Sequence, residues 1–361
     1  MRLFQNSGLY PSYIPRLRQL SKHASSFAQQ IGVFLDDRFG APHFLQPVLQ
    51  RQPEAFFTNG DDSVAQRQWA AERGIAGTPS LESILLAQIE EHCTEVFYNM
   101  DPMRYSSDFV RKLPGCVKRA IAWRAAPSPG ADFSAYARVI CNFPSILESY
   151  RKAGWNAAYF APAHDPVMDA YADNTDRPID VLFVGGYTRH HRRRAELLEA
   201  VAGLQNIHLV VLHLDRSRAT RLAESAVGRL LPVSAHRRPP VIRRLSRPPV
   251  FGLDLYAALS HAKVVVNGAI DMAGVDRGNM RCFEAMGCGC VLVTDDGHYP
   301  DGMVDRQTML TYGNSAEAVA SIQIALREPA RAQTLADNAG LMIRAKYGKA
   351  HQWLAFQALL A

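Results

Sequence analysis

The stretch Asp276-Arg-Gly-Asn-Met-Arg-Cys-Phe-Glu284-Ala-Met-Gly-Cys-Gly-Cys-Val-Leu-Val-Thr-Asp295 decides the fold. It predicts a loop, a short helix over residues 280–286, a glycine-rich break and a buried strand over residues 291–294. A short, mainly apolar strand that follows a helix is typical of the parallel sheets of α/β proteins. The two carboxylates that bracket the loop can accept hydrogen bonds from hydroxyl groups. The stretch therefore predicts a site for a polyol joined to a nucleotide.

Both halves of the chain alternate short apolar runs with amphipathic stretches, which predicts parallel βαβ units. Two helices have clear start signals: Thr78 and Pro79 before one, and Pro144 at the first position of another. The Arg- and Pro-rich residues 232–249 predict a long loop. The strand-like runs are residues 54–58, 94–98, 118–123, 137–141, 180–184, 207–212, 263–266 and 291–294.

The length of 361 residues allows two domains, with the polar segment 162–178 as their boundary. We predict one domain over residues 1–165, a second over 166–345, and a C-terminal helix over 346–361 that packs back toward the first domain. No apolar stretch is long enough to span a membrane, and the first residues lack the apolar core of a signal peptide. We therefore expect a cytoplasmic protein.

Six scattered cysteines show no zinc-like spacing, so they predict reduced thiols and no metal site. The formal net charge of +6 comes largely from arginines between residues 189 and 247. Such a basic stripe suits nucleic acid, an anionic membrane surface or a phosphorylated substrate.

The predicted phosphate loop is Gly185-Gly-Tyr-Thr-Arg-His-His-Arg-Arg-Arg194, between a strand end and a helix start. Ligands of open α/β sheets bind at this edge, and glycines let the backbone approach an anion. Four arginines and two histidines in six consecutive positions oppose the helix dipole, so helix stability does not explain them. A bound pyrophosphate does explain them, with Arg189 as the contact that we favour.

The opening stretch resembles the donor-site signature of the group-1 glycosyltransferases, in which two acids separated by seven residues lead into a Glu-Ala-x-x-x-Gly run. Asp276 stands where that family usually has Glu. Together with residues 136–154, 180–185 and 250–267, the stretch is similar to the CgeB-like branch of this family. The resemblance implies a GT-B architecture, in which two Rossmann-like, doubly wound α/β domains face each other across a cleft.

The resemblance implies that the second domain binds the donor and the first the acceptor. Asp276 and Glu284 are then the catalytic pair, with Glu284 on the ribose of a nucleotide-sugar and Asp276 near its hexose. The donor-binding residues, besides Glu284, would be Gly185, Gly186, Thr188, Arg189, Gly278, Asn279 and Arg281. On the acceptor side we name Gly8, Trp123, Arg124 and His164, from their places after strand-like runs or at the domain boundary.

The leading hypothesis is a hexosyltransferase of polysaccharide biosynthesis that moves a sugar from a nucleoside diphosphate to a glycan, glycolipid or small acceptor. The resemblance implies a retaining reaction. We expect it to need no metal, because the chain supplies its own cations and shows no Asp-x-Asp set beside the phosphate loop, and no cofactor beyond the nucleotide-sugar. Residues 216–247 are expected to meet an anionic acceptor or the inner face of a membrane. Two alternatives remain: a nucleotide-sugar epimerase of the same fold, and a non-catalytic basic protein that binds nucleic acid, which we do not expect.

Overall fold

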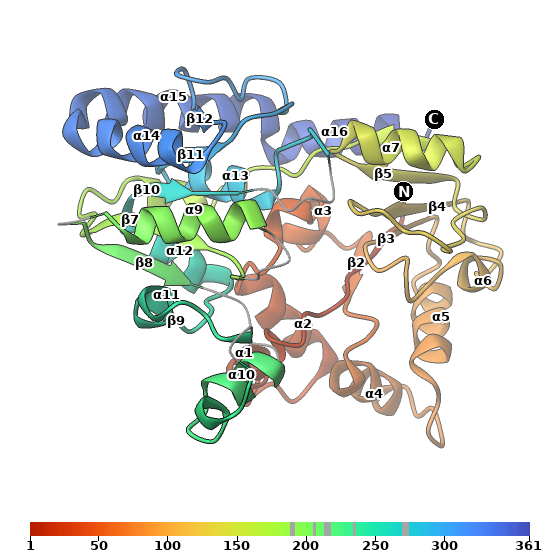
Figure 1. The fold of residues 1–361 in the computed structure, drawn as a ribbon. Coiled ribbons are helices and arrows are strands. Elements are labelled where there is room, and N and C mark those ends of the chain that lie inside the picture. The colour runs from red at the N-terminus through yellow and green to blue at the C-terminus, as the bar shows by residue number, and fades with distance from the viewer. Residues whose placement is uncertain (188–191, 205–206, 213–217, 234–235, 269–273) are drawn as a thin grey trace. The chain divides into compact units, whose positions relative to one another are not determined.

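The chain folds into two α/β units, each built around its own parallel sheet (Figure 1). The computed structural model describes all residues except 188–191, 205–206, 213–217, 234–235 and 269–273. Unit 1 comprises Met1–Ala163, Met272–Asp276 and Tyr347–Ala361, and unit 2 comprises His164–Asp271 and Arg277–Lys346. The α/β class predicted from the alternation of strands and helices is confirmed.

Unit 1 has a six-stranded sheet in the order β2-β1-β3-β4-β5-β6, and all its neighbouring strands are parallel. The strands are β1 (Leu3–Asn6), β2 (Ala55–Thr58), β3 (Val96–Asn99), β4 (Arg119–Trp123), β5 (Arg138–Cys141) and β6 (Ala157–Tyr159). The helices are α1 (Ile14–Leu20), α2 (Phe27–Asp36), η1 (Ala41–His43), α3 (Gln46–Leu49), α4 (Ser63–Glu72), α5 (Leu81–Glu91), α6 (Ser107–Val110), α7 (Pro144–Lys152) and α16 (Lys349–Ala358).

The last helix, α16, packs into the core of unit 1. Phe356 is fully buried, and its ring lies 5.0 Å from that of Tyr98 in β3 and 5.8 Å from that of Phe160. The ammonium group of Lys349 is buried as well. It donates to the carbonyl oxygens of Ala41 (2.7 Å) and Phe44 (2.8 Å), so the cost of burying its charge is offset by hydrogen bonds.

Unit 2 has a second six-stranded parallel sheet, in the order β12-β11-β10-β7-β8-β9. The strands are β7 (Ile179–Val184), β8 (Leu209–Leu212), β9 (Ser246–Arg247), β10 (Ala262–Val266), β11 (Val291–Asp295) and β12 (Leu310–Tyr312). The helices are α8 (Met168–Ala172), α9 (Arg192–Ala202), α10 (Arg218–Glu224), η2 (Gly228–Leu230), α11 (Pro240–Leu245), α12 (Gly252–Ser260), α13 (Met280–Gly287), α14 (Ser315–Arg327) and α15 (Pro329–Tyr347).

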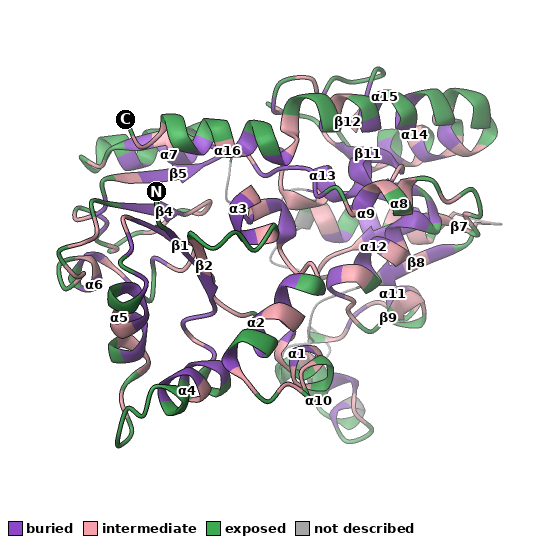
Figure 2. Ribbon diagram, turned by 180° about the vertical axis from the view of Figure 1, so that it is seen from behind, coloured by how far each residue is buried: buried purple, intermediate pink, exposed green. Residues whose placement is uncertain are grey.

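Helices cover both faces of the sheet in unit 2. Alternate strand residues such as Val181, Val264 and Val293 belong to the core cluster that includes Leu197 of α9 and Ile322 of α14. On the other face α8, α12 and α13 pack together against β10 and β11. Figure 2 shows the resulting concentration of buried residues on the central strands.

The prediction of a long loop over residues 232–249 is wrong, because the described part of this segment contains α11 and β9. Ile242 is fully buried in the core of unit 2, and β9 pairs with β8. Burial of the Ile242 side chain anchors this segment to the core of unit 2, although its arginine- and proline-rich composition predicts a loop. Among the described residues, no helix is both long and apolar enough to cross a membrane.

Candidate functional site: the carboxyl edges of the two sheets

The loop before α13 lies at the carboxyl ends of β10 and β11 and is tied to them by side-chain amides. Gly278 has φ +95°, a left-handed conformation that favours glycine. The next residue, Asn279, is the N-cap of α13 and donates to Asn267 Oδ1 (3.3 Å). Asn267 in turn donates to Thr294 Oγ1 at the end of β11 (3.2 Å). The first turn of α13 therefore starts from a polar network at the edge where ligands of α/β sheets bind.

Glu284 lies in the second turn of α13, in the helix that the sequence predicted. It is only 2% exposed, and its Oε2 lies 2.5 Å from Nη1 of Arg281, one turn earlier. Burial raises the pKa of Glu284, although the guanidinium of Arg281 works in the opposite direction. A buried carboxylate with one fixed cationic partner retains lone pairs that can accept hydrogen bonds from a polyol.

Asp276, the other predicted catalytic acid, belongs to unit 1 and contacts helix α7 there. Its Oδ2 accepts a hydrogen bond from the backbone N–H of Ser145 (2.6 Å), in the first turn of α7. The N-cap residue of this helix, Phe143, has no side chain able to cap it. Asp276 therefore supplies an N-terminal cap from a distant part of the sequence.

The predicted phosphate loop is only partly described. Gly185 and Gly186 follow β7 directly, and a Cβ on Gly185 would lie 3.0 Å from the ring of Phe183, whereas one on Gly186 would meet nothing within 4 Å. Thr188 and Arg189 lie outside the described residues.

Two arginines that we did not select as site residues lie at the same edge. Arg194, in the first turn of α9, donates to the carbonyl of Gly268 beyond β10 (2.5 Å). Arg277 is 9% exposed and its Nε lies 2.5 Å from Oδ2 of Asp295, the last residue of β11. Arg194 belongs to the cationic run of the predicted phosphate loop, and its hydrogen bond to Gly268 places it beyond the end of β10.

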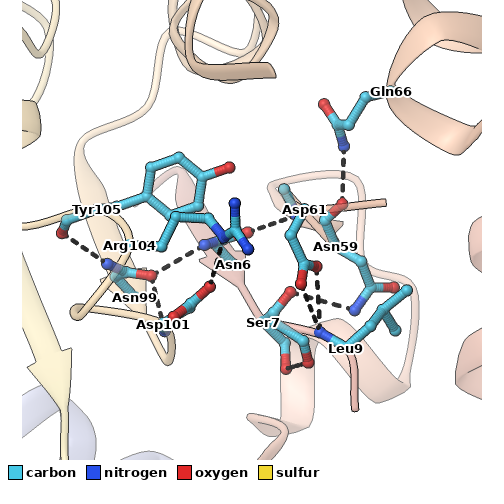
Figure 3. Close-up of polar contacts among 12 residues, drawn as sticks. Asn6, Ser7, Leu9, Asn59, Asp61, Gln66, Asn99, Asp101, Arg104 and Tyr105 are labelled. Carbon is cyan, nitrogen blue, oxygen red and sulfur yellow. Dashed lines mark hydrogen bonds and ion pairs between the residues drawn. The ribbon is translucent and has the colours of Figure 1, made fainter. Parts of the chain in front are cut away.

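Unit 1 has a second polar centre, at the carboxyl ends of β1, β2 and β3 (Figure 3). Asn6 and Asn99 end β1 and β3, lie opposite each other in the register, and are fully buried. Asn6 donates to Asn99 Oδ1 (2.9 Å) and accepts from the N–H of Gly60 (2.8 Å), while Asn99 Oδ1 also accepts from the N–H of Asp101 (3.0 Å). These amides hold the loops after β2 and β3 in place.

The two loops bring the carboxylates of Asp61 and Asp101 into this centre (Figure 3). Both oxygens of Asp61 lie 3.1 Å from the N–H of Leu9, and Asp101 pairs with Arg104 (3.3 Å). Burial raises the pKa of both carboxyls, and the charge of Asp101 raises the pKa of Asp61 further.

A buried tyrosine hydroxyl borders these carboxylates. Tyr105 is 2% exposed, and no described group bonds its hydroxyl. A Cβ added to Gly60 would lie 2.8 Å from that hydroxyl, and one added to Gly8 would lie 3.0 Å from Asp101 Oδ2. The predicted acceptor residue Gly8 is therefore in this centre, and both glycines provide room that larger residues would fill.

The other predicted acceptor-side residues lie elsewhere. Trp123 is 8% exposed and packs against His43 and Phe160. Arg124 donates to Ser128 Oγ (2.8 Å).

His164 belongs to unit 2. Its Nε2 lies 3.0 Å from Asp169, and a Cβ on Gly287 would lie 2.9 Å from its Nδ1, which places it at the C-terminal end of α13. Burial lowers the pKa of His164.

The sequence analysis did not predict Asp61, Asp101 or Tyr105 as site residues. The signal in the sequence that could have indicated this polar centre is an asparagine at or just after the end of three strands: Asn6, Asn59 and Asn99.

Groups of three or more His, Cys, Asp or Glu side chains placed to hold a metal ion are absent from the described part of the chain.

Comparisons with known proteins agree with this architecture. Residues 192–358 match the family model described as glycosyl transferase-like. The fold is similar to that of HepE from Anabaena, solved with UDP-glucose, with a TM-score of 0.60, 10% identity, and coverage of 99% of this chain and 98% of HepE. For sucrose-phosphate synthase from Thermosynechococcus elongatus the TM-score is 0.56 and the identity 14%, with 99% and 98% of the two chains covered.

The crystal structure of TarM is similar over 78% of this chain and 58% of TarM, with a TM-score of 0.54 and 12% identity. No curated protein matches the sequence significantly. The chain thus has the GT-B fold, as predicted, and its residues 192–358, which include α13, match the glycosyl transferase-like family.

Proposed function

We propose that this protein is a glycosyltransferase that moves a sugar from a nucleoside-diphosphate sugar to a hydroxyl of a glycan, glycolipid or small molecule. The observation that carries the proposal is the buried Glu284–Arg281 pair in α13, at the ligand-binding edge of a GT-B sheet. The match of residues 192–358 to the glycosyl transferase-like family supports it. HepE was solved with UDP-glucose, so uridine diphosphate sugars are the first donors to test.

In the proposed reaction the bond between the sugar C1 and the diphosphate oxygen breaks, the acceptor oxygen forms a new bond to C1, and the proton of the acceptor hydroxyl passes to the leaving diphosphate. Negative charge develops on the leaving diphosphate, where fixed cations and helix N–H groups stabilise the transition state. Arg194 and Arg281 are the described cations that we assign to this task, and Glu284 holds the ribose hydroxyls. Asp61 and Asp101 accept hydrogen bonds from the acceptor's hydroxyls.

The finer assignment is a retaining, metal-independent hexosyltransferase of the CgeB-like branch that works in the cytoplasm. Its basis is the resemblance of residues 276–295 to the family signature, and arginines on the chain that can take the place of a metal ion. Transfer in the presence of EDTA tests whether the reaction is metal-independent. The anomeric configuration of the product, determined by NMR, tests whether it is retaining.

The central experiment replaces Glu284 by Gln, which keeps the shape and an oxygen for Arg281. A hydrogen bond to a charged group contributes about 1.5–3 kcal/mol, so UDP binding should weaken roughly 10- to 150-fold while the circular dichroism spectrum stays unchanged. Transfer from UDP-glucose should fall at least as much. Glu328→Gln is the matched control, because the Glu328 side chain is 49% exposed and pairs with Arg331.

Full transfer by Glu284→Gln would overturn the assignment of the donor site. An altered free nucleotide-sugar, formed with no acceptor present, would instead identify an epimerase.

A further inference from the structure

The described part of residues 218–247, which leaves out residues 234–235, forms a folded projection of unit 2, and we call it the arginine-rich segment. It contains α10, η2, α11 and β9. A buried ion pair holds it together: Arg238 Nε lies 2.7 Å from Glu224 Oε1, with side chains 7% and 4% exposed. Arg237 adds hydrogen bonds to the carbonyls of Ala223 (3.0 Å) and Gly228 (2.7 Å). Two of the arginines are therefore structural, and the segment has a defined shape.

Four large apolar side chains of this segment are exposed within ten residues of sequence. Leu222 is 52% exposed, Val227 65%, Leu230 88% and Leu231 42%. We call these four residues the apolar tip. Figures 1 and 2 both show α10 at the end of unit 2 opposite α14 and α15, with its following turn leading away from the sheet. Exposed apolar side chains gathered in this way mark a surface that meets a partner or a membrane.

The charge around the apolar tip selects the kind of partner. Glu224 is the one acid in residues 218–247, and it is buried against Arg238. Among the arginines of the segment whose burial the structure describes, five are exposed: Arg218, Arg221, Arg243, Arg244 and Arg247. Their positive charge is thus not neutralised by any acid of the segment itself. A folded segment that exposes both leucines and a valine and several arginines matches the interface of an anionic bilayer, where apolar side chains enter and guanidinium groups bind lipid phosphates.

We propose that the arginine-rich segment is a docking surface for an anionic membrane, with the apolar tip inserted at the headgroup level. Nucleic acid is a poorer fit, because residues 218–247 contain no Phe, Tyr or Trp on which bases could stack. The proposal goes beyond glycosyl transfer and does not depend on it. It proposes where the protein acts, namely at the surface of a membrane that carries anionic lipids.

The test is co-sedimentation of the full chain with vesicles of phosphatidylcholine alone or with about 30% phosphatidylglycerol. We expect binding to the anionic vesicles only, weakening as salt is raised. The double variant Val227→Asp and Leu230→Asp should bind at least tenfold more weakly. Arg243→Gln with Arg244→Gln should bind roughly 25-fold more weakly at low salt, since each arginine near such a surface contributes about fivefold.

Control variants make the same kinds of change, apolar to Asp and Arg to Gln, at exposed positions outside the segment. Leu341→Asp with Leu354→Asp alters side chains that are 63% and 64% exposed on α15 and α16. Arg67→Gln with Arg331→Gln removes two exposed charges outside the segment. These variants should bind as the unchanged protein does.

Three outcomes would each overturn the proposal. They are equal binding to neutral and anionic vesicles, undiminished binding by the tip variant, and a tip that instead mediates dimerisation or nucleic-acid binding. The readout needs no transferase activity, so it stands apart from the test of Glu284.

Discussion

Asp61 is held where its negative charge lowers the stability of the protein. Burial and the neighbouring Asp101 both raise its pKa, while the N–H of Leu9 and the charge of Arg104 act in the opposite direction. A group whose folded pKa is raised contributes stability that is complete at low pH and lost as the pH rises through that pKa. Residues that weaken the fold in this way are expected at functional sites.

Replacing Asp61 by Asn should therefore raise the thermal midpoint at pH 7, because the amide carries no charge to desolvate and can still accept from Leu9 N–H. The gain should shrink as the pH falls below the raised pKa of Asp61, where the natural carboxyl is protonated. Thermal unfolding between pH 3 and pH 8 measures both effects. Asp108→Asn is the control, since the Asp108 side chain is 84% exposed and should show neither. A lower midpoint at pH 7 would contradict this account.

The sequence identifies Glu284 and Gly278 because they belong to one continuous motif with a recognisable order. Asp61 and Asp101 lie 40 positions apart in ordinary loops, and only the parallel register of β1, β2 and β3 brings their loops together. Trp123 illustrates the opposite case: a position at a strand end does not reveal which way the side chain points, and this one packs among aromatic rings.

At the scale of helices and strands, α7 depends on a cap that its own sequence lacks. Asp276→Ala should lower the free energy of unfolding by about 0.5–2 kcal/mol, the range for loss of an N-terminal cap. Asp276→Asn should keep most of that stability, because asparagine caps equally well. Urea unfolding measures the difference between the two variants.

The variants Asp276→Ala and Asp276→Asn also distinguish the structural role of Asp276 as a helix cap from its proposed role in contacting the donor sugar. If its carboxylate also contacts the donor, Asp276→Asn loses transfer while it stays stable. Equal stability of Asp276→Ala and the natural protein would show that the bond to Ser145 contributes nothing.

Helix starts were predictable where one local signal dominates. Pro144 opens α7 as expected, whereas α5 begins at Leu81 with Ser80 as its cap rather than at Pro79 after Thr78. Ser80 Oγ accepts from Ser83 N–H, a capping bond that competes successfully with the proline signal. The turn of helix in residues 240–245 was missed because its single buried residue, Ile242, is surrounded by arginine and proline.

For the whole molecule, the alternation of strands and helices predicts two parallel sheets but not the order of their strands. The strand order depends on which apolar faces of strands and helices pack together after long connecting segments. The position of β1 between β2 and β3 is one example, and it creates the polar centre of unit 1.

Nucleotide binding should stabilise the whole chain in a way that depends on Glu284. A ligand at 100 times its dissociation constant adds about 2.7 kcal/mol to the free energy of unfolding. We expect UDP to raise the thermal midpoint, with ADP, GDP, TDP and CMP as comparisons, with magnesium and with EDTA. Glu284→Gln should reduce the shift. If none of these nucleotides moves the midpoint of the natural protein, the donor site as described here does not bind nucleotide by itself.

The placement of α16 has a consequence for how the protein is made. Unit 1 begins at the first residue of the chain, yet Phe356 and Lys349 of its core come from the last helix. Domains commonly fold in the order in which they leave the ribosome. Here the core of unit 1 is complete only after α16 has been synthesised, because Phe356 of α16 packs against Tyr98 and Phe160. Part of the core of the unit that is translated first therefore comes from a helix that is translated after unit 2.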